Sequence, residues 1–165
     1  MATWGEFAAA APEMARGGRV LWEQHGVMFV ATVRADLSPR LHPVVPVLAA
    51  DRMFVAVGSW SPKWQDLQRE PRCVLHCLPG RRDDEFVMRC RAHGTPEAVE
   101  EVRRSADHVI HDDDHLFELD IEAVDYGWWE NVGQPDTYPV RRRWTPGGGL
   151  RTLRAGRTQT DTAPN

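Results

Sequence analysis

Short apolar runs separated by turn-forming residues dominate the chain and predict β-strands. The runs are rich in β-branched and aromatic residues, and Gly, Pro, Asp and Ser gather between them, which is typical of a largely antiparallel β protein. We expect strands at residues 27–34, 40–48, 53–57, 72–78, 85–93, 116–126 and 138–144.

Two of these runs give more than a strand assignment. Residues 85–93 alternate, and this period of two predicts that Phe86, Met88, Cys90 and Ala92 share the buried side. Residues 40–48 contain Pro43 and Pro46, which cannot donate hydrogen bonds to a neighbouring strand. That strand must therefore be bulged, bent or exposed at an edge. Its free backbone could meet a flat ligand, or proline there could simply protect an edge strand.

Helices are predicted in three places. Ser61 is a suitable N-cap with Pro62 in the first helical position, and this helix must end by Glu70 because Pro71 follows. A second helix begins at Thr95, and a third lies within residues 4–25, ends at Gly26 and is weakened by two internal glycines. Together the elements predict one small, mostly antiparallel barrel with added helices.

Composition narrows the functional classes. The chain has 165 residues, 42% hydrophobic and 27% charged residues, and a net charge of −4, which does not favour nucleic-acid binding. No apolar run is long enough to span a bilayer, and the N-terminus does not resemble a signal peptide, so we expect a cytoplasmic protein that makes no membrane contact. Three cysteines, Cys73, Cys77 and Cys90, favour buried thiols over disulfides or zinc.

The segment around Lys63 is the best candidate for binding chemistry. Lys63 is the only lysine, and it falls in the first turn of the Ser61 helix, where a cation opposes the helix dipole. Serine hydroxyls, free N–H groups and one ammonium suit an external phosphate. An ordinary capped surface helix with a solvated lysine is the alternative.

A second cluster, HVIHDDDH at residues 108–115, has histidines on one helical face with acids between them. Because it lacks a strong ligand spacing, we favour a solvated acidic loop over a metal site.

Residues 27–93 resemble the pyridoxamine 5'-phosphate oxidase-like family, the FMN-binding split barrels. The similar stretches are FVATVRADLSPRLHPVVPV, MFVAVGSWSPK, WQDLQREPRCVLH and DDEFVMRCRAHG, in that order. The resemblance implies an antiparallel split β-barrel in residues 1–153 with an N-terminal helical arm, and a homodimer that binds flavin between its subunits. From Thr145 the sequence is rich in Gly, Arg and Thr and has few large apolar residues, so we expect a flexible tail at residues 154–165.

The resemblance also implies site residues. Ser61-Pro62-Lys63 corresponds to the family's phosphate clamp, with proline in place of its arginine, and the strand starting at His42 would contact the flavin ring through its backbone. His42 stands where an oxidase has arginine, Val47 replaces a second phosphate-binding lysine, and Val57 and Ser59 would line the ribityl chain. The implied cofactor-binding residues are His42, Pro43, Val44, Val45, Val57, Ser59, Ser61 and Lys63.

Two functions follow from these observations. The first is an oxidoreductase that holds FMN or a deazaflavin at the dimer interface and acts on a small, planar substrate beside Trp60, Trp128 or Trp129, which could equally be core or interface aromatics. The sequence identifies no general acid or base. The second is a non-catalytic protein that stores or senses flavin or haem. The candidate axial ligands for haem are His25, His42, His76 and His93.

Overall fold

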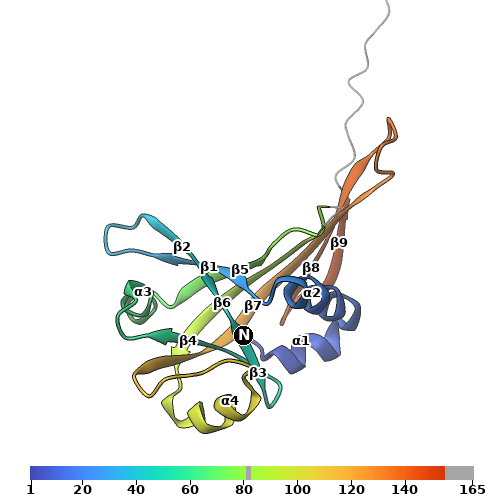
Figure 1. Cartoon of the computed structure of the whole chain (residues 1–165). Coiled ribbons are helices and arrows are strands. Elements are labelled where there is room, and N and C mark those ends of the chain that lie inside the picture. Colours follow the sequence, from blue (N-terminus) through green and yellow to red (C-terminus); the bar gives the residue numbers. More distant parts are fainter. Residues whose placement is uncertain (81–82, 155–165) are drawn as a thin grey trace, which may run out of the picture.

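The computed structural model describes residues 1–80 and 83–154, and within them nine strands form one open antiparallel sheet (Figure 1). The strands are β1 Met28–Val33, β2 Pro39–Val44, β3 Pro46–Ala49, β4 Arg52–Gly58, β5 Arg72–Cys77, β6 Glu85–Gly94, β7 Asp114–Glu130, β8 Tyr138–Thr145 and β9 Gly149–Arg154. The main path runs β2-β1-β5-β6-β7-β4-β3, and β8 pairs with β7 and carries β9. The predicted fold class, mostly antiparallel β with added helices and a barrel that is split, is confirmed.

The helices lie against this curved sheet. They are α1 Trp4–Ala10, α2 Pro12–His25, α3 Pro62–Arg69 and α4 Val99–Ser105, and a 3-10 turn, η1 Pro96–Ala98, precedes α4. The predicted helix that stops at Gly26 is α2, and Gly26 caps it with a left-handed φ of 69°. The structure adds α1, which the sequence analysis did not predict and which Thr3 and Glu6 close with a capping box.

The main core lies on the inner face of the sheet. The predicted alternation in β6 is confirmed, since Phe86, Met88, Cys90 and Ala92 are each at most 3% exposed. The glycines of α2 do not break the helix. A Cβ added at Gly18 would lie 2.5 Å from the Phe86 ring, so glycine lets α2 pack directly on β6.

The break between β2 and β3 changes one prediction. Residues 40–48 form two strands instead of one, and these pair at opposite ends of the strand order, β2 with β1 and β3 with β4. Val45 belongs to neither ladder, and Pro46 begins the second strand. The expected edge exposure is confirmed for both halves, because each is the last strand on its side.

The C-terminal strands extend away from the rest of the molecule as an arm (Figure 1). β7 is longer than the predicted residues 116–126 and includes Trp128 and Trp129. β9 follows the strand predicted to be the last, and it pairs with β8 from Gly149 to Arg154. The flexible tail predicted for residues 154–165 lies, from residue 155 onward, outside the described residues.

No helix in the described part of the chain is long and apolar enough to cross a membrane.

Candidate functional site

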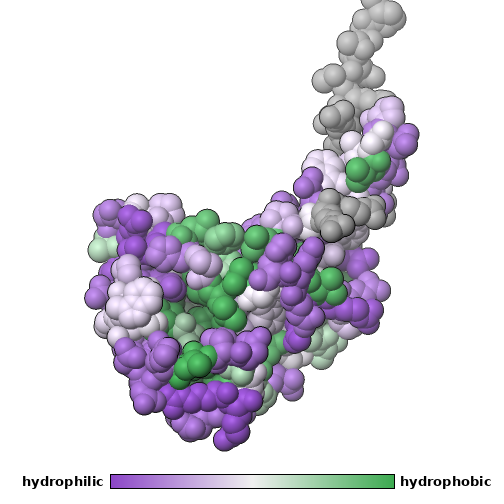
Figure 2. Space-filling model, viewed as in Figure 1, coloured by the Kyte–Doolittle hydropathy of each residue, from purple (hydrophilic) through white to green (hydrophobic). Residues whose placement is uncertain are grey.

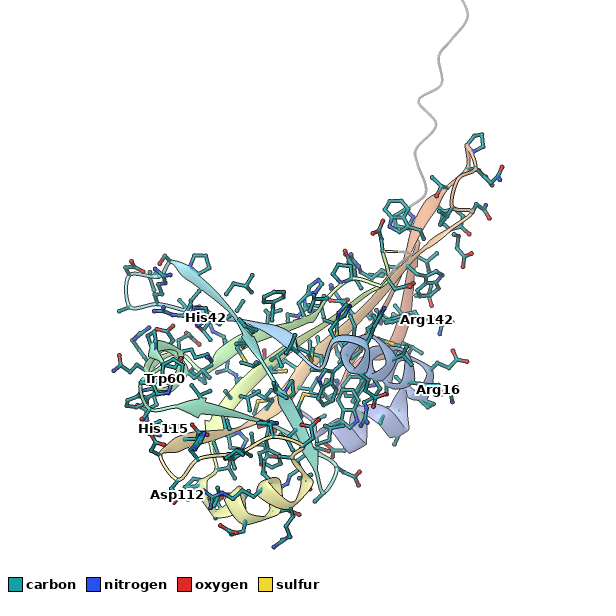
Figure 3. The ribbon with its side chains drawn as sticks, in the orientation of Figure 1. Arg16, His42, Trp60, Asp112, His115 and Arg142 are labelled. Atoms are coloured by element: carbon teal, nitrogen blue, oxygen red, sulfur yellow. The ribbon has the colours of Figure 1, made fainter. Side chains whose placement is uncertain are left out.

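A cleft of about 370 Å³ opens where the β2–β3 break faces the start of α3. Its walls are Val27, Pro43, Val44, Val45, Ala56, Gly58, Trp60, Lys63, His108, Val109 and Asp114. Hydrophobic side chains gather in the hollow centre of this face of the molecule (Figure 2), beside the position at which Figure 3 labels Trp60. We call this space the Lys63 cleft.

Lys63, the only lysine of the chain, brings its ammonium group to this cleft. Ser61 occupies the N-cap position of α3 as predicted, but its side chain makes no capping hydrogen bond to the helix backbone. Its buried hydroxyl instead accepts a hydrogen bond from Lys63 Nζ at 3.2 Å. Burial, followed by the nearby Arg40 guanidinium, lowers the pKa of Lys63. The ammonium is half-buried and held beside a helix N-terminus, an arrangement suited to an anion.

The β2–β3 break supplies unpaired backbone on the opposite wall. Pro43, Val44 and Val45 line the cleft, and Val45 contributes its N–H and C=O to neither strand ladder. Because β2 and β3 are both terminal strands, their outer edges also lie outside the sheet ladders. A flat ligand bearing donors and acceptors can therefore bind along this edge through the main chain.

The loop after β4 is fastened to the segment that precedes β7. Ser59 Oγ donates to the carboxylate of Asp113 at 2.7 Å, and the Ser59 carbonyl accepts from Trp64 Nε1 at 2.7 Å. The hydrogen bond from Ser59 lowers the pKa of Asp113. Together with the pairing of Gly58 with Asp114, these bonds hold residues 108–114 at the cleft.

Four of the predicted cofactor-binding residues meet in the cleft, and four lie around it. Pro43, Val44, Val45 and Lys63 line it. Ser61 and Ser59 do not line the cleft, but Ser61 hydrogen-bonds to Lys63 and Ser59 to Asp113 next to it. Val57 is 1% exposed and belongs to the core. Its neighbours in β4, Ala56 and Gly58, line the cleft instead.

His42 lies on β2, directly opposite Val30, and therefore on the inner face of the sheet outside the cleft wall (Figure 3). Burial, then the positive charges of Lys63 and Arg40, lower the pKa of His42. Its imidazole is therefore neutral near pH 7 and is a hydrogen-bonding group there, not an anion-binding cation.

The other predicted ligand candidates lie elsewhere. His25 is exposed in the last turn of α2, the His76 ring contacts the carbonyl of Cys77, and His93 lines a different cavity. Trp128 and Trp129 line a depression on the C-terminal arm, whereas Trp60, 85% exposed, stands at the rim of the Lys63 cleft.

The position of residues 108–114 in the cleft wall was not predicted from the sequence. His108, Val109 and Asp114 line it, although they are about fifty residues away from Lys63 in sequence. Among residues 1–80 and 83–154, no group of three or more His, Cys, Asp or Glu residues is arranged to hold a metal ion. The signal that could have placed the segment is the pairing of β4 with β7, which local sequence does not reveal.

Comparison with known proteins gives structural relatives only. The chain matches no family model, and no curated protein sequence matches it significantly. A haem-binding protein from Mycobacterium smegmatis is similar in structure, with a TM-score of 0.56 and 11% identity over 87% of this chain and 88% of the other.

Two further solved structures resemble the chain over most of its length. PhzG from Burkholderia lata 383, in complex with tetrahydrophenazine-1-carboxylic acid, has a TM-score of 0.60 and 11% identity over 89% of this chain and 93% of its own. A pyridoxamine 5'-phosphate oxidase-related, FMN-binding protein from Nostoc punctiforme has a TM-score of 0.56 and 13% identity over 90% of this chain and 95% of its own. This chain therefore has the split-barrel fold of the pyridoxamine 5'-phosphate oxidase-like proteins.

Proposed function

We propose that this chain binds FMN, or a deazaflavin, in the Lys63 cleft and serves as a flavin-dependent oxidoreductase for a small, planar substrate. The observation that carries the proposal is the pairing of one half-buried ammonium, at the start of α3, with the unpaired backbone of the β2–β3 break. The ammonium suits a phosphate, and the backbone suits the polar edge of a flavin ring. The cleft volume of about 370 Å³ is within the usual range of cofactor sites.

A second copy of the chain is the partner that this site favours. On the outer face of the sheet, cross-strand pairing groups Phe29 with Pro43, Ala31 with Leu41, and Ala31 with Val74. These side chains are all apolar, and each is half-buried or exposed. A single chain therefore leaves this part of the face uncovered. Pro43 belongs to this face and also lines the cleft. A protomer that covers the face would therefore border the cofactor.

The protein residues bind and orient, and a flavin supplies the redox chemistry when it is bound. Lys63 and Ser61 would hold the phosphate, Val44 and Val45 the ring, and the exposed indole of Trp60 would stack on a planar substrate. No acid or base is assigned. The three cysteines are free thiols, which suits a reducing compartment such as the cytoplasm.

A non-catalytic flavin- or haem-binding protein is the second candidate. It is favoured by His108, an imidazole in the wall of the cleft that could serve as an axial haem ligand. The haem-binding protein from Mycobacterium smegmatis has a similar fold, although at 11% identity that likeness concerns the fold alone.

The visible spectrum of the purified protein, before and after addition of FMN, a deazaflavin or haem, tests the proposal. We expect a flavin or deazaflavin spectrum, and anaerobic bleaching of the bound cofactor by NADH, NADPH or a reduced deazaflavin donor. A Soret band that depends on His108 would favour haem binding, and a protein that ignores all three cofactors would refute both candidates.

The position of the cofactor at a dimer interface has its own test. Pro43→Asp places a charge on the outer face at the border of the cleft, and we expect it to shift sedimentation from dimer to monomer and to weaken FMN binding. Leu37→Asp is the matched control, because Leu37 is 82% exposed at the β1–β2 turn and its positive φ of 66° suits aspartate. A monomeric wild-type protein that binds FMN would contradict the interface proposal.

A further inference from the structure

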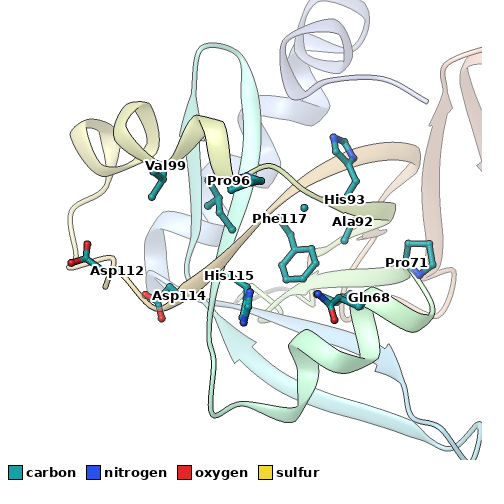
Figure 4. Close-up of a pocket in the computed structure, with 13 residues that line it drawn as sticks. Gln68, Pro71, Ala92, His93, Pro96, Val99, Asp112, Asp114, His115 and Phe117 are labelled. Carbon is teal, nitrogen blue, oxygen red and sulfur yellow. The ribbon is translucent and has the colours of Figure 1, made fainter.

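A second and larger cavity, of about 530 Å³, lies beside the C-terminal half of α3 (Figure 4). It is bounded by α3, the end of β6, the η1 turn and the start of β7. Apart from Asp114, none of its lining residues lines the Lys63 cleft. The proposed flavin function leaves this space without a role.

The floor of this cavity is apolar and firmly packed. Leu67, Ala92, Leu116 and Phe117 line it, and each of them is at most 5% exposed. Buried side chains of this kind form a fixed surface, and they favour the burial of an apolar group.

An aromatic wall stands beside the floor. His115 lines the cavity, and its imidazole stacks on Trp64 with the ring centroids 4.3 Å apart and an interplanar angle of 21°. The stack holds the imidazole in one orientation, so it can pack against a flat ring in the cavity.

Both carboxylates that line the cavity lie at one end of it. Asp112 and Asp114 line one end, and among the described residues no lysine or arginine lines it. The Asp114 carboxylate accepts the backbone N–H of His111 at 2.8 Å, which fixes its position without neutralising it. Asp112 is paired with Arg103 at 2.5 Å, whereas Asp114 forms no salt bridge with any described residue and supplies the charge at this end.

At the other end the lining residue is His93, and the acidic residues beside it, Glu118 and Asp120, do not line the cavity. His93 lies between two carboxylates, with its ring nitrogens 3.7 Å from Glu118 Oε2 and 3.6 Å from Asp120 Oδ2. Arg52 also pairs with Glu118 at 3.0 Å, so this end adds no acidic lining residue to the one that Asp114 supplies.

From the apolar floor, the flat wall and the Asp114 carboxylate we propose that this cavity binds a small planar organic cation, such as an aromatic amine in its ammonium form. The ring would lie on Phe117 beside His115, and the ammonium would face Asp114. A phosphate or carboxylate ligand would meet like charge there and is disfavoured.

Benzylammonium is a suitable probe, with benzoate and benzyl alcohol as its anionic and neutral counterparts. Binding to the flavin-free protein is followed by the ¹H–¹⁵N resonance of the Trp64 indole, assigned from a Trp64→Phe variant. For a probe of about eight non-hydrogen atoms we expect a Kd on the order of 1 mM. Benzoate should bind at least tenfold more weakly. A response of the Trp60 indole alone, or equal binding of benzoate, would overturn the proposal.

Gly94 allows the cavity to be filled without disturbing the fold. A Cβ at Gly94 meets nothing within 4 Å, and Gly94 lines the cavity, so Gly94→Leu should abolish the Trp64 shift. Gly147→Leu is the matched control, because a Cβ at Gly147 also meets open space, far away in the β8–β9 turn. Unchanged binding to Gly94→Leu would show that the probe binds elsewhere.

A second pair of variants tests the charge. Asp114→Asn keeps an acceptor for His111 and removes the negative charge, and we expect the Kd for benzylammonium to rise about two- to fivefold. Asp107→Asn, an exposed carboxylate of the same loop outside the cavity, should leave it unchanged. Equal effects of both variants would refute a specific contact with Asp114. Because flavin is absent, failure here leaves the proposed function untouched.

Discussion

Replacing Asp66 with asparagine is expected to loosen α3 from the sheet and to weaken ligand binding in the Lys63 cleft. Asp66 is 4% exposed and accepts three hydrogen bonds, from Thr32 Oγ1 at 3.0 Å, Arg40 Nε at 2.6 Å and Arg69 Nη2 at 3.1 Å. Thr32 and Arg40 belong to β1 and β2, so this carboxylate joins the helix that carries Lys63 to the strands that form the opposite wall.

The expected loss of stability depends on the Arg40 charge that stays buried without its carboxylate partner. Breaking a buried ion pair by removing one partner costs about 3–5 kcal/mol, because the other charge stays buried. The Arg40 side chain is 17% exposed, and asparagine still offers one acceptor oxygen, so we expect a smaller loss than this range, about 2–3 kcal/mol. For a chain of this size that corresponds to a fall in Tm of about 5–10 °C.

Urea unfolding of the wild type and of Asp66→Asn measures this loss. Glu70→Gln is the matched control, because Glu70 pairs with Arg72 at the surface and its loss should leave the unfolding midpoint unchanged. A loss of less than about 1 kcal/mol for Asp66→Asn would refute the role of the carboxylate as the anchor of α3.

The stability that Asp66 contributes should depend on pH. Burial works to raise the pKa of Asp66, but the hydrogen bonds from Arg40, Thr32 and Arg69 outweigh it, and the pKa lies below its ordinary value of 3.8. The carboxylate therefore contributes fully to stability above pH 3.8, and this contribution is lost as the pH falls through the lower folded-state pKa. The difference between wild type and Asp66→Asn should be constant near pH 7 and should shrink below about pH 4.

Three further predictions concern the core and the cleft. Gly18→Ala should cost about 1–3 kcal/mol in urea unfolding, since its Cβ would lie 2.5 Å from the Phe86 ring; a neutral effect would contradict the close packing of α2 on β6. Burial raises the pKa of Cys73 and Cys77 to about 12, so Ellman's reagent should label neither in the native protein at pH 8 and both after unfolding; rapid native labelling would contradict their burial. The imidazole of His42 should titrate by NMR below its ordinary pKa of 6.5, because burial and nearby cations disfavour its charged form; a value above 6.5 would contradict its position on β2.

Local sequence was sufficient to predict most of the strands and α3, but not β9. The alternation from Phe86 to Ala92 and the Ser61-Pro62 start followed from period and capping alone, and both are present in the structure. The β2–β3 break was foreseen only as an irregularity. Two prolines exclude a continuous ladder of hydrogen bonds, but they do not indicate with which strands the two halves pair.

The cleft was harder to predict because register decides which side chains face it. In β4, Val57 belongs to the core and its neighbours Ala56 and Gly58 line the cleft, since successive residues of a strand point to opposite faces. The segment that contains His108 and Asp114 reaches the cleft through the pairing of β4 with β7 and the hydrogen bond from Ser59 to Asp113. Contacts of that kind depend on the tertiary fold and leave no local pattern.

The affinities of FMN and riboflavin for the wild type and for Lys63→Ala test most directly whether Lys63 holds a cofactor phosphate. A charge-assisted hydrogen bond to phosphate contributes about 1.5–3 kcal/mol, so FMN should bind the variant about 10- to 150-fold more weakly. Riboflavin, which lacks the phosphate, should bind both proteins within about twofold of each other. Equal weakening of the two flavins, or no change in the affinity for FMN, would contradict the account.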